Sequence, residues 1–83
     1  MSLEYYKKQM VDLRAKLQRE KDAKKKDNEY YARMVKFSST PSGKASYRKM
    51  KIDRAASHDR QIESIKRQIE NCKDNIARER KRK

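Results

Sequence analysis

Apolar side chains recur along both halves of the chain in steps that alternate between three and four residues. In the first half this repeat runs from Leu3 to Met34, and in the second half it runs from Ala55 to Ile76. Such spacing places apolar side chains on one stripe of an α-helix, which is the pattern of a coiled-coil seam. The sequence therefore predicts an all-α fold in which two long helices pack along these stripes. The expected seam residues are Leu3, Tyr6, Met10, Leu13, Leu17, Tyr31, Met34, Tyr47, Ile62, Ile65, Ile69 and Ile76.

The only proline and the only glycine of the chain, Pro41 and Gly43, lie close together near its midpoint. Pro41 lacks the N–H group of a continuing helix and biases Thr40 away from the helical region, so the first helix should end between residues 37 and 39. Two starts fit the second helix. Either Thr40 caps a helix with Pro41 at its first position, or Ser42 caps a helix that begins at Gly43.

A short connector normally makes neighbouring helices antiparallel, so the sequence predicts a two-helix hairpin. We expect one domain over residues 1–83, with the first helix over 2–37, the turn over 38–43 and the second helix over 44–80. Residues 81–83 are expected to form a frayed basic tail.

Polar residues occupy the seam in the middle of each helix. When the chain is folded at its midpoint, facing positions have numbers that sum to about 80. Leu17 then faces Ile65, while Lys24 and Asp27 lie opposite His58 and Arg54. We therefore expect the polar residues of both helices to share one hydrated or salt-bridged layer.

A rod of two helices buries only one stripe on each helix, which seldom stabilises so small a domain without help. We therefore expect a helical protein partner, in a hetero-oligomer or in a homo-oligomer of this chain. Met50 or Ile52 should continue the second seam back toward Tyr47. A stripe wider than a two-stranded seam accepts further helices, and five apolar side chains widen it here: Tyr5, Val11, Tyr30, Met50 and Ile52.

The sequence contains no arrangement of residues typical of an enzyme, a cofactor site or a metal site. It has no histidine pair at helical spacing, no cysteine cluster and no glycine-rich phosphate loop. Cys72 falls on the seam, where a cysteine acts as a small apolar residue, and His58 belongs to the polar layer. We expect no catalytic residue, no cofactor and no metal. The chain also lacks an apolar run of the roughly 20 residues that span a membrane, which makes the cytoplasm the expected compartment.

Charge is the strongest compositional feature of the chain. Lys and Arg number 25 against 12 Asp and Glu, for a net charge of +13, and this charge attracts polyanions and acidic proteins alike. The cations are spread along both arms among the acids, which favours solvated faces over a nucleic-acid site. A basic nucleic-acid accessory protein therefore remains the alternative. Its contacts would come from two basic runs, Lys24, Lys25, Lys26 and Arg80, Lys81, Arg82, Lys83.

Two short segments carry a resemblance to a known family. The chain opens with "MSLEYY", and "PSGKASY" places Gly43, Ala45 and Tyr47 at the turn. These segments resemble the small helical hairpins encoded beside LXG toxins of type VII secretion, which are distant relatives of the WXG family. Pro41 stands where that family has tryptophan, and no Tyr-x-x-x-Asp/Glu export signal follows the second helix.

The resemblance implies a partner and a role. In that family the hairpins bind the long N-terminal helical domain of the toxin side by side and act as its targeting partner or chaperone. Gly43 and Ala45 would permit close approach of the helices at the turn, and the wide apolar stripe would be the docking face. The complex would leave the cytoplasm through a type VII system. The remaining alternative is a homo-oligomeric coiled-coil structural element.

Overall fold

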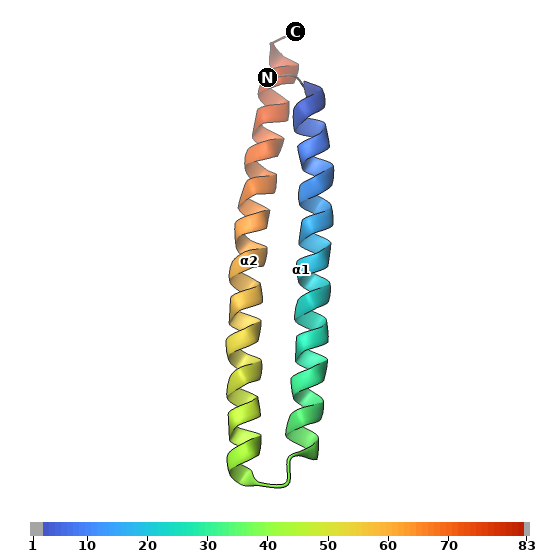
Figure 1. Cartoon of the computed structure of the whole chain (residues 1–83). Helices are drawn as coiled ribbons and strands as arrows, with labels where there is room; N and C mark the ends of the chain where they lie inside the picture. Colours follow the sequence, from blue (N-terminus) through green and yellow to red (C-terminus); the bar gives the residue numbers. More distant parts are fainter. Residues whose placement is uncertain (1–2, 83) are drawn as a thin grey trace.

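The computed structural model of the protein describes residues 3–82 and contains two long α-helices (Figure 1). Helix α1 spans Leu3–Phe37 and helix α2 spans Pro41–Lys81. The helices run antiparallel, with the start of α1 beside the end of α2, and they form a rod that measures 65 × 14 × 12 Å. The helical hairpin predicted from the apolar repeat is thus confirmed.

The connection between the helices is shorter than the sequence indicated. Thr40 has an extended backbone, with φ −117° and ψ 146°, and its hydroxyl accepts a hydrogen bond of 3.0 Å from the Gly43 N–H. Pro41 occupies the first helical position, where no N–H group is needed. The first of the two possible caps is therefore the observed one, and α2 begins three residues before the predicted start at residue 44.

The two ends of the hairpin also differ from the prediction. Helix α2 continues through Lys81 and Arg82 caps it, so these two residues do not form a frayed tail. Residue 2, the expected start of the first helix, and Lys83 lie outside the described residues.

Gly43 lies at a close approach in the connection, against two side-chain hydroxyls. A Cβ atom at this position would lie 2.9 Å from the Thr40 hydroxyl oxygen and would collide with the hydroxyl of Ser38. Ser38 belongs to the turn, and its N–H closes the last turn of α1 on the Met34 carbonyl at 3.0 Å. Ala45 is exposed, so of the two small residues expected at a close approach, only Gly43 is in one.

The buried core occupies one half of the rod. Five side chains form the buried cluster, namely Met10, Leu13, Ile65, Ile69 and Cys72, and the half-buried Tyr6, Leu17 and Ile76 pack against it. Ile62 is buried at 8% exposure. We call this part of the hairpin, with α1 up to Leu17 and α2 from Ile62 onward, the open half. The remaining seam residues, which are Leu3 near the open end and Tyr31, Met34 and Tyr47 toward the turn, are half-buried.

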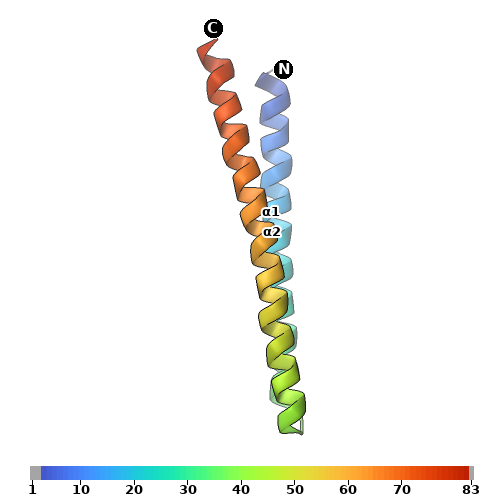
Figure 2. The same ribbon diagram turned by 90° about the vertical axis from the view of Figure 1, so that its left-hand side faces the viewer.

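Near the turn, the seam of α2 is shifted by one residue from its predicted position at Met50 or Ile52. Met50 and Ile52 are 44% and 68% exposed, while Lys51 between them is half-buried. A step of four residues back from Ala55 reaches Lys51, so a regular heptad places a lysine on the seam and the two apolar residues on its flanks. The view in Figure 2 shows the helices crossing at a shallow angle, as in a coiled coil.

Candidate protein-docking surface

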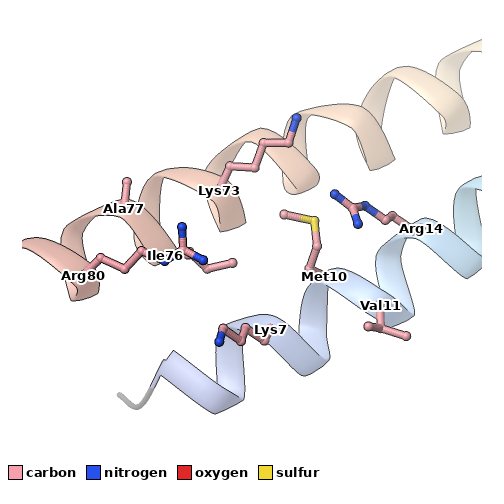
Figure 3. Close-up of a pocket in the computed structure, with 8 residues that line it drawn as sticks. All are labelled: Lys7, Met10, Val11, Arg14, Lys73, Ile76, Ala77 and Arg80. Atoms are coloured by element: carbon pink, nitrogen blue, oxygen red, sulfur yellow. The ribbon is translucent and has the colours of Figure 1, made fainter.

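A groove runs between the helices near the open end of the hairpin. Helix α1 contributes Lys7, Met10, Val11 and Arg14, and helix α2 contributes Lys73, Ile76, Ala77 and Arg80 (Figure 3). We call these eight residues the basic groove. Met10 and Ile76 form its apolar centre, the four cations form its rim, and Val11 and Ala77 lie outside the rim.

The apolar centre of the groove extends the hydrophobic core to the surface. Met10 is buried at 6% exposure and points toward α2, whereas the adjacent Val11 is 66% exposed and points away from α2 (Figure 3). On α2, Ala77 follows the seam residue Ile76 in the same way. Val11 and Ala77 each lie about 100° around the helix from a seam residue, so each helix has one apolar residue on the outer side of the groove.

The rim consists of cations at heptad spacing. Lys7 and Arg14 lie seven residues apart on α1, and Lys73 and Arg80 lie seven residues apart on α2, so each pair follows one edge of its helix. Among the residues that the structure describes, only Lys73 of these four forms an ion pair, a 3.5 Å contact with the exposed Glu70. Like charges therefore face each other across the groove.

The same register continues the cationic rows toward the middle of the rod. One further heptad step reaches Lys21 on α1 and Lys66 on α2. The positions on the opposite side of the seam are mostly uncharged, and they include Gln9, Gln61 and Gln68. Six cations thus follow this edge of the seam, namely Lys7, Arg14, Lys21, Lys66, Lys73 and Arg80, while Lys8, Lys16, Arg67 and Arg78 lie on other faces of the helices.

A polar layer separates the open half from the turn. His58 bridges both helices, with Nδ1 2.6 Å from Glu20 Oε1 and Nε2 2.6 Å from Asp27 Oδ2. Arg54 Nη2 lies 3.0 Å from the same Asp27 oxygen, as the folded register predicted. Lys24 does not contact His58 but pairs with Asp59 at 2.5 Å.

The two carboxylates favour the protonated form of His58. Hydrogen bonds to Asp27 and then to Glu20 raise the pKa of the imidazole above its ordinary value, although its partial burial opposes this. The hydrogen bond from His58 is also the largest cause that lowers the pKa of Asp27, and Arg54 adds to it. A protonated imidazole donates from both nitrogens, so His58 ties α2 to two places on α1.

The half of the hairpin near the turn exposes more of its apolar surface. Tyr30 is 48% exposed and packs edge-on against Tyr31 with ring centroids 5.1 Å apart, and Phe37 is 74% exposed. A second shallow groove lies beside the polar layer and is lined by Lys24, Asn28, Arg48, Lys51, Ile52 and Ala55. Exposed apolar surface next to cations therefore occurs at two places along the rod.

The residues expected to contact a polyanion are not brought together. Lys24 is paired with Asp59, while Lys25 and Lys26 are exposed in the middle of α1. Arg80 lies in the basic groove, Lys81 ends α2, and Arg82 contacts Glu79 at 3.4 Å. More than 20 residues of helix separate the two runs along the rod, a distance of roughly 30 Å. They form no single patch.

Several residues of the groove were not among the expected site residues. These are Lys7, Arg14, Lys73 and Ala77, and a search for apolar repeats alone does not select the cations as a site, whereas Val11 was already expected to widen the apolar stripe. The signal that identifies the cations is their spacing of seven residues along the same edge of the seam on both helices.

Other kinds of site find no support in residues 3–82. The described part of the chain contains no group of three or more metal-ligating side chains. Cys72 is buried, and its Sγ donates to the Tyr6 carbonyl at 3.1 Å. Within the described range neither helix carries an apolar stretch of the length that a membrane span requires.

Comparisons with protein-family models, with curated proteins and with solved structures found no match to this chain. Its function therefore has to be argued from the geometry of the hairpin.

Proposed function

We propose that this chain is a non-enzymatic docking module that binds another helical protein through the apolar surface left uncovered by the hairpin. The observation that carries the proposal is the imbalance between core and surface. Among residues 3–82, six apolar side chains are buried, while six large ones remain between 44% and 74% exposed. The exposed ones are Tyr5, Val11, Tyr30, Phe37, Met50 and Ile52.

Their distribution supports docking of a helix. Val11 and Ile52 each lie beside a groove between α1 and α2. A groove between two antiparallel helices is where a third helix packs in a bundle, since its side chains then fill the spaces on both neighbours. Burial of a valine or isoleucine side chain contributes about 1.5–3 kcal/mol, so covering a few such residues would stabilise a complex.

The resemblance to the hairpin partners of LXG toxins gives this proposal its most specific form. In that form the partner is the N-terminal helical domain of a toxin, and the chain acts as its targeting partner or chaperone. It binds in the cytoplasm and leaves the cell with the toxin through a type VII system. The antiparallel helices and the short turn are compatible with this role.

The test is co-expression with the product of the neighbouring gene, followed by size-exclusion chromatography. We expect a stoichiometric complex that persists at about 0.3 M salt, because apolar burial is not screened by ions. Val11→Glu should weaken the complex while the hairpin stays helical, since Val11 is 66% exposed. Gln9→Glu is the matched control, because it makes the same charge change on the opposite side of α1.

Two results would contradict the proposal. One is a chain that elutes alone as a monomer and melts in a sharp transition whose midpoint is independent of concentration, since such a hairpin needs no partner. The other is a complex that Val11→Glu and Gln9→Glu weaken equally, which would place binding outside the exposed apolar surface.

A further inference from the structure

We infer that the basic groove binds one acidic amphipathic helix, whose apolar stripe packs over Met10 and Ile76 and whose carboxylates pair with the cations on both rims. This inference rests on the proposed docking function and names the chemistry of the partner. It also places the contact at the open end of the hairpin.

The arrangement of the cations is the main argument. In a stable antiparallel coiled coil, residues that flank the seam on facing helices normally carry opposite charges. Here Lys7 and Arg14 on one edge face Arg80 and Lys73 on the other across an apolar strip. Like charges in such positions destabilise the isolated hairpin. A helix with carboxylates on both flanks of its stripe would convert this repulsion into two rows of ion pairs.

The apolar centre indicates the shape of the ligand. Met10 and Ile76 form a narrow apolar strip between the rows, while Ala77 and Val11, which is 66% exposed, lie beyond the rows on the outer sides of their helices. The cationic rows extend from Lys7 to Lys21, a span of 14 residues or about 21 Å of helix. A partner helix of about four turns would cover this length.

Charge argues against the other occupants. A second copy of this chain carries the same net charge of +13 and the same cationic rows, so docking at this groove would set cations against cations. A nucleic acid would pair with the rows through its phosphates but would offer no apolar stripe for Met10 and Ile76. An acidic amphipathic helix satisfies both features of the groove.

The test uses the full chain and a labelled synthetic peptide of three heptads with leucine at the a and d positions and glutamate at e and g. Repulsion between its glutamates keeps this peptide from pairing with itself. One control peptide has glutamine in place of every glutamate, and a second keeps the composition but scrambles the order. We expect binding by fluorescence anisotropy for the acidic peptide, at least about tenfold weaker binding for the glutamine peptide, and no binding for the scrambled one.

Paired charge reversals locate the contact. Arg14→Glu with Lys73→Glu reverses one cation on each rim, and we expect it to weaken peptide binding at least about tenfold. Arg19→Glu with Arg78→Glu makes the same change in net charge at exposed positions that the heptad register places on the other face. This control should bind within about threefold of the original chain. Helicity by circular dichroism shows whether each variant still folds.

Each contrary outcome overturns the inference. Equal weakening by both double variants would mean general charge attraction. No weakening by Arg14→Glu with Lys73→Glu would place the peptide elsewhere. If duplex DNA binds at about 0.15 M salt and only Arg14→Glu with Lys73→Glu abolishes this binding, the groove is a nucleic-acid site. Self-association that only the groove variant removes would assign it to a second copy.

The outcome separates this inference from the proposed function. If the acidic peptide fails to bind but the co-expressed helical protein still forms a complex, the docking function stands and the groove is not its site. If the groove variant loses the peptide while the complex persists, the docking function again stands without this contact, and the inference is wrong.

Discussion

Ile65 and Ile52 offer a direct measurement of where the stability of the hairpin resides. Both are isoleucines of α2, but Ile65 is 2% exposed and Ile52 is 68% exposed. Replacing each with alanine removes the same atoms from the same helix. Any difference between the two variants therefore reports burial and packing alone.

The expected effects follow from the number of carbon atoms removed. Ile65→Ala deletes three carbons from the core, which corresponds to about 2.4 kcal/mol of transfer free energy. In a two-helix rod, neighbouring side chains and water can close much of the space, so we expect the cavity to raise the total only to about 3 kcal/mol. Ile52→Ala should change the free energy of unfolding by less than about 0.5 kcal/mol, and it gains from the higher helix propensity of alanine.

Urea unfolding followed by far-ultraviolet circular dichroism measures both values. A single core in so small a domain rarely contributes more than about 3–5 kcal/mol, so Ile65→Ala should shift the midpoint by about 2–3 M or leave no folded baseline. Ile52→Ala should unfold at the same urea concentration as the original chain. Equal midpoints for the two variants would refute the view that the open half holds the core.

Three further predictions test the polar layer, the turn and the surface charge. Because the pKa of His58 is raised, the stability that His58 contributes is complete below its ordinary pKa of about 6.5 and is lost as pH rises through the raised pKa. The stability that Asp27 contributes is instead lost as pH falls through its lowered pKa. In melts at a series of pH values, His58→Gln should therefore flatten the loss of stability at higher pH. Gly43→Ala should lower the melting temperature by disturbing the Thr40 cap, at a cost of up to about 1–2 kcal/mol, and adding Ser38→Ala should recover part of the loss. The affinity for duplex DNA should fall steeply between about 0.05 and 0.15 M salt without preference for any sequence, whereas specific submicromolar binding at the higher salt would favour a nucleic-acid function.

The fold was largely predictable because one physical signal decides it. Apolar residues at steps of three and four give the helices, and a single proline beside a single glycine gives the turn. The boundaries were less predictable, since Thr40 and Ser42 are both good caps. Only the structure shows that the Thr40 hydroxyl accepts from Gly43, which moves the start of α2 to Pro41.

The surface was harder to predict because apolar character and heptad position disagree there. Met50 and Ile52 were predicted as seam residues because they are hydrophobic, yet the regular heptad repeat places Lys51 on the seam. A lysine tolerates a half-buried seam position since its methylene stem packs while its ammonium group reaches solvent. Similarly, the net charge gave no indication of a face, because the grouping of Lys7 and Arg14 with the cations of α2 depends on the antiparallel pairing.

The position of the cations beside the best-packed part of the rod has an energetic consequence. Repulsion between the rows of the basic groove opposes the same helix contacts that Leu13, Ile65 and Ile69 stabilise. The apolar core can hold the helices together against this repulsion, whereas the half near the turn has no fully buried side chain among the described residues. Salt should therefore stabilise the isolated hairpin by screening the groove, and it should weaken binding of an acidic helix for the same reason. Salt should thus raise the stability of the hairpin and lower its affinity for an acidic helix, because the same cations cause both effects. An apolar contact would not give this pair of opposite responses.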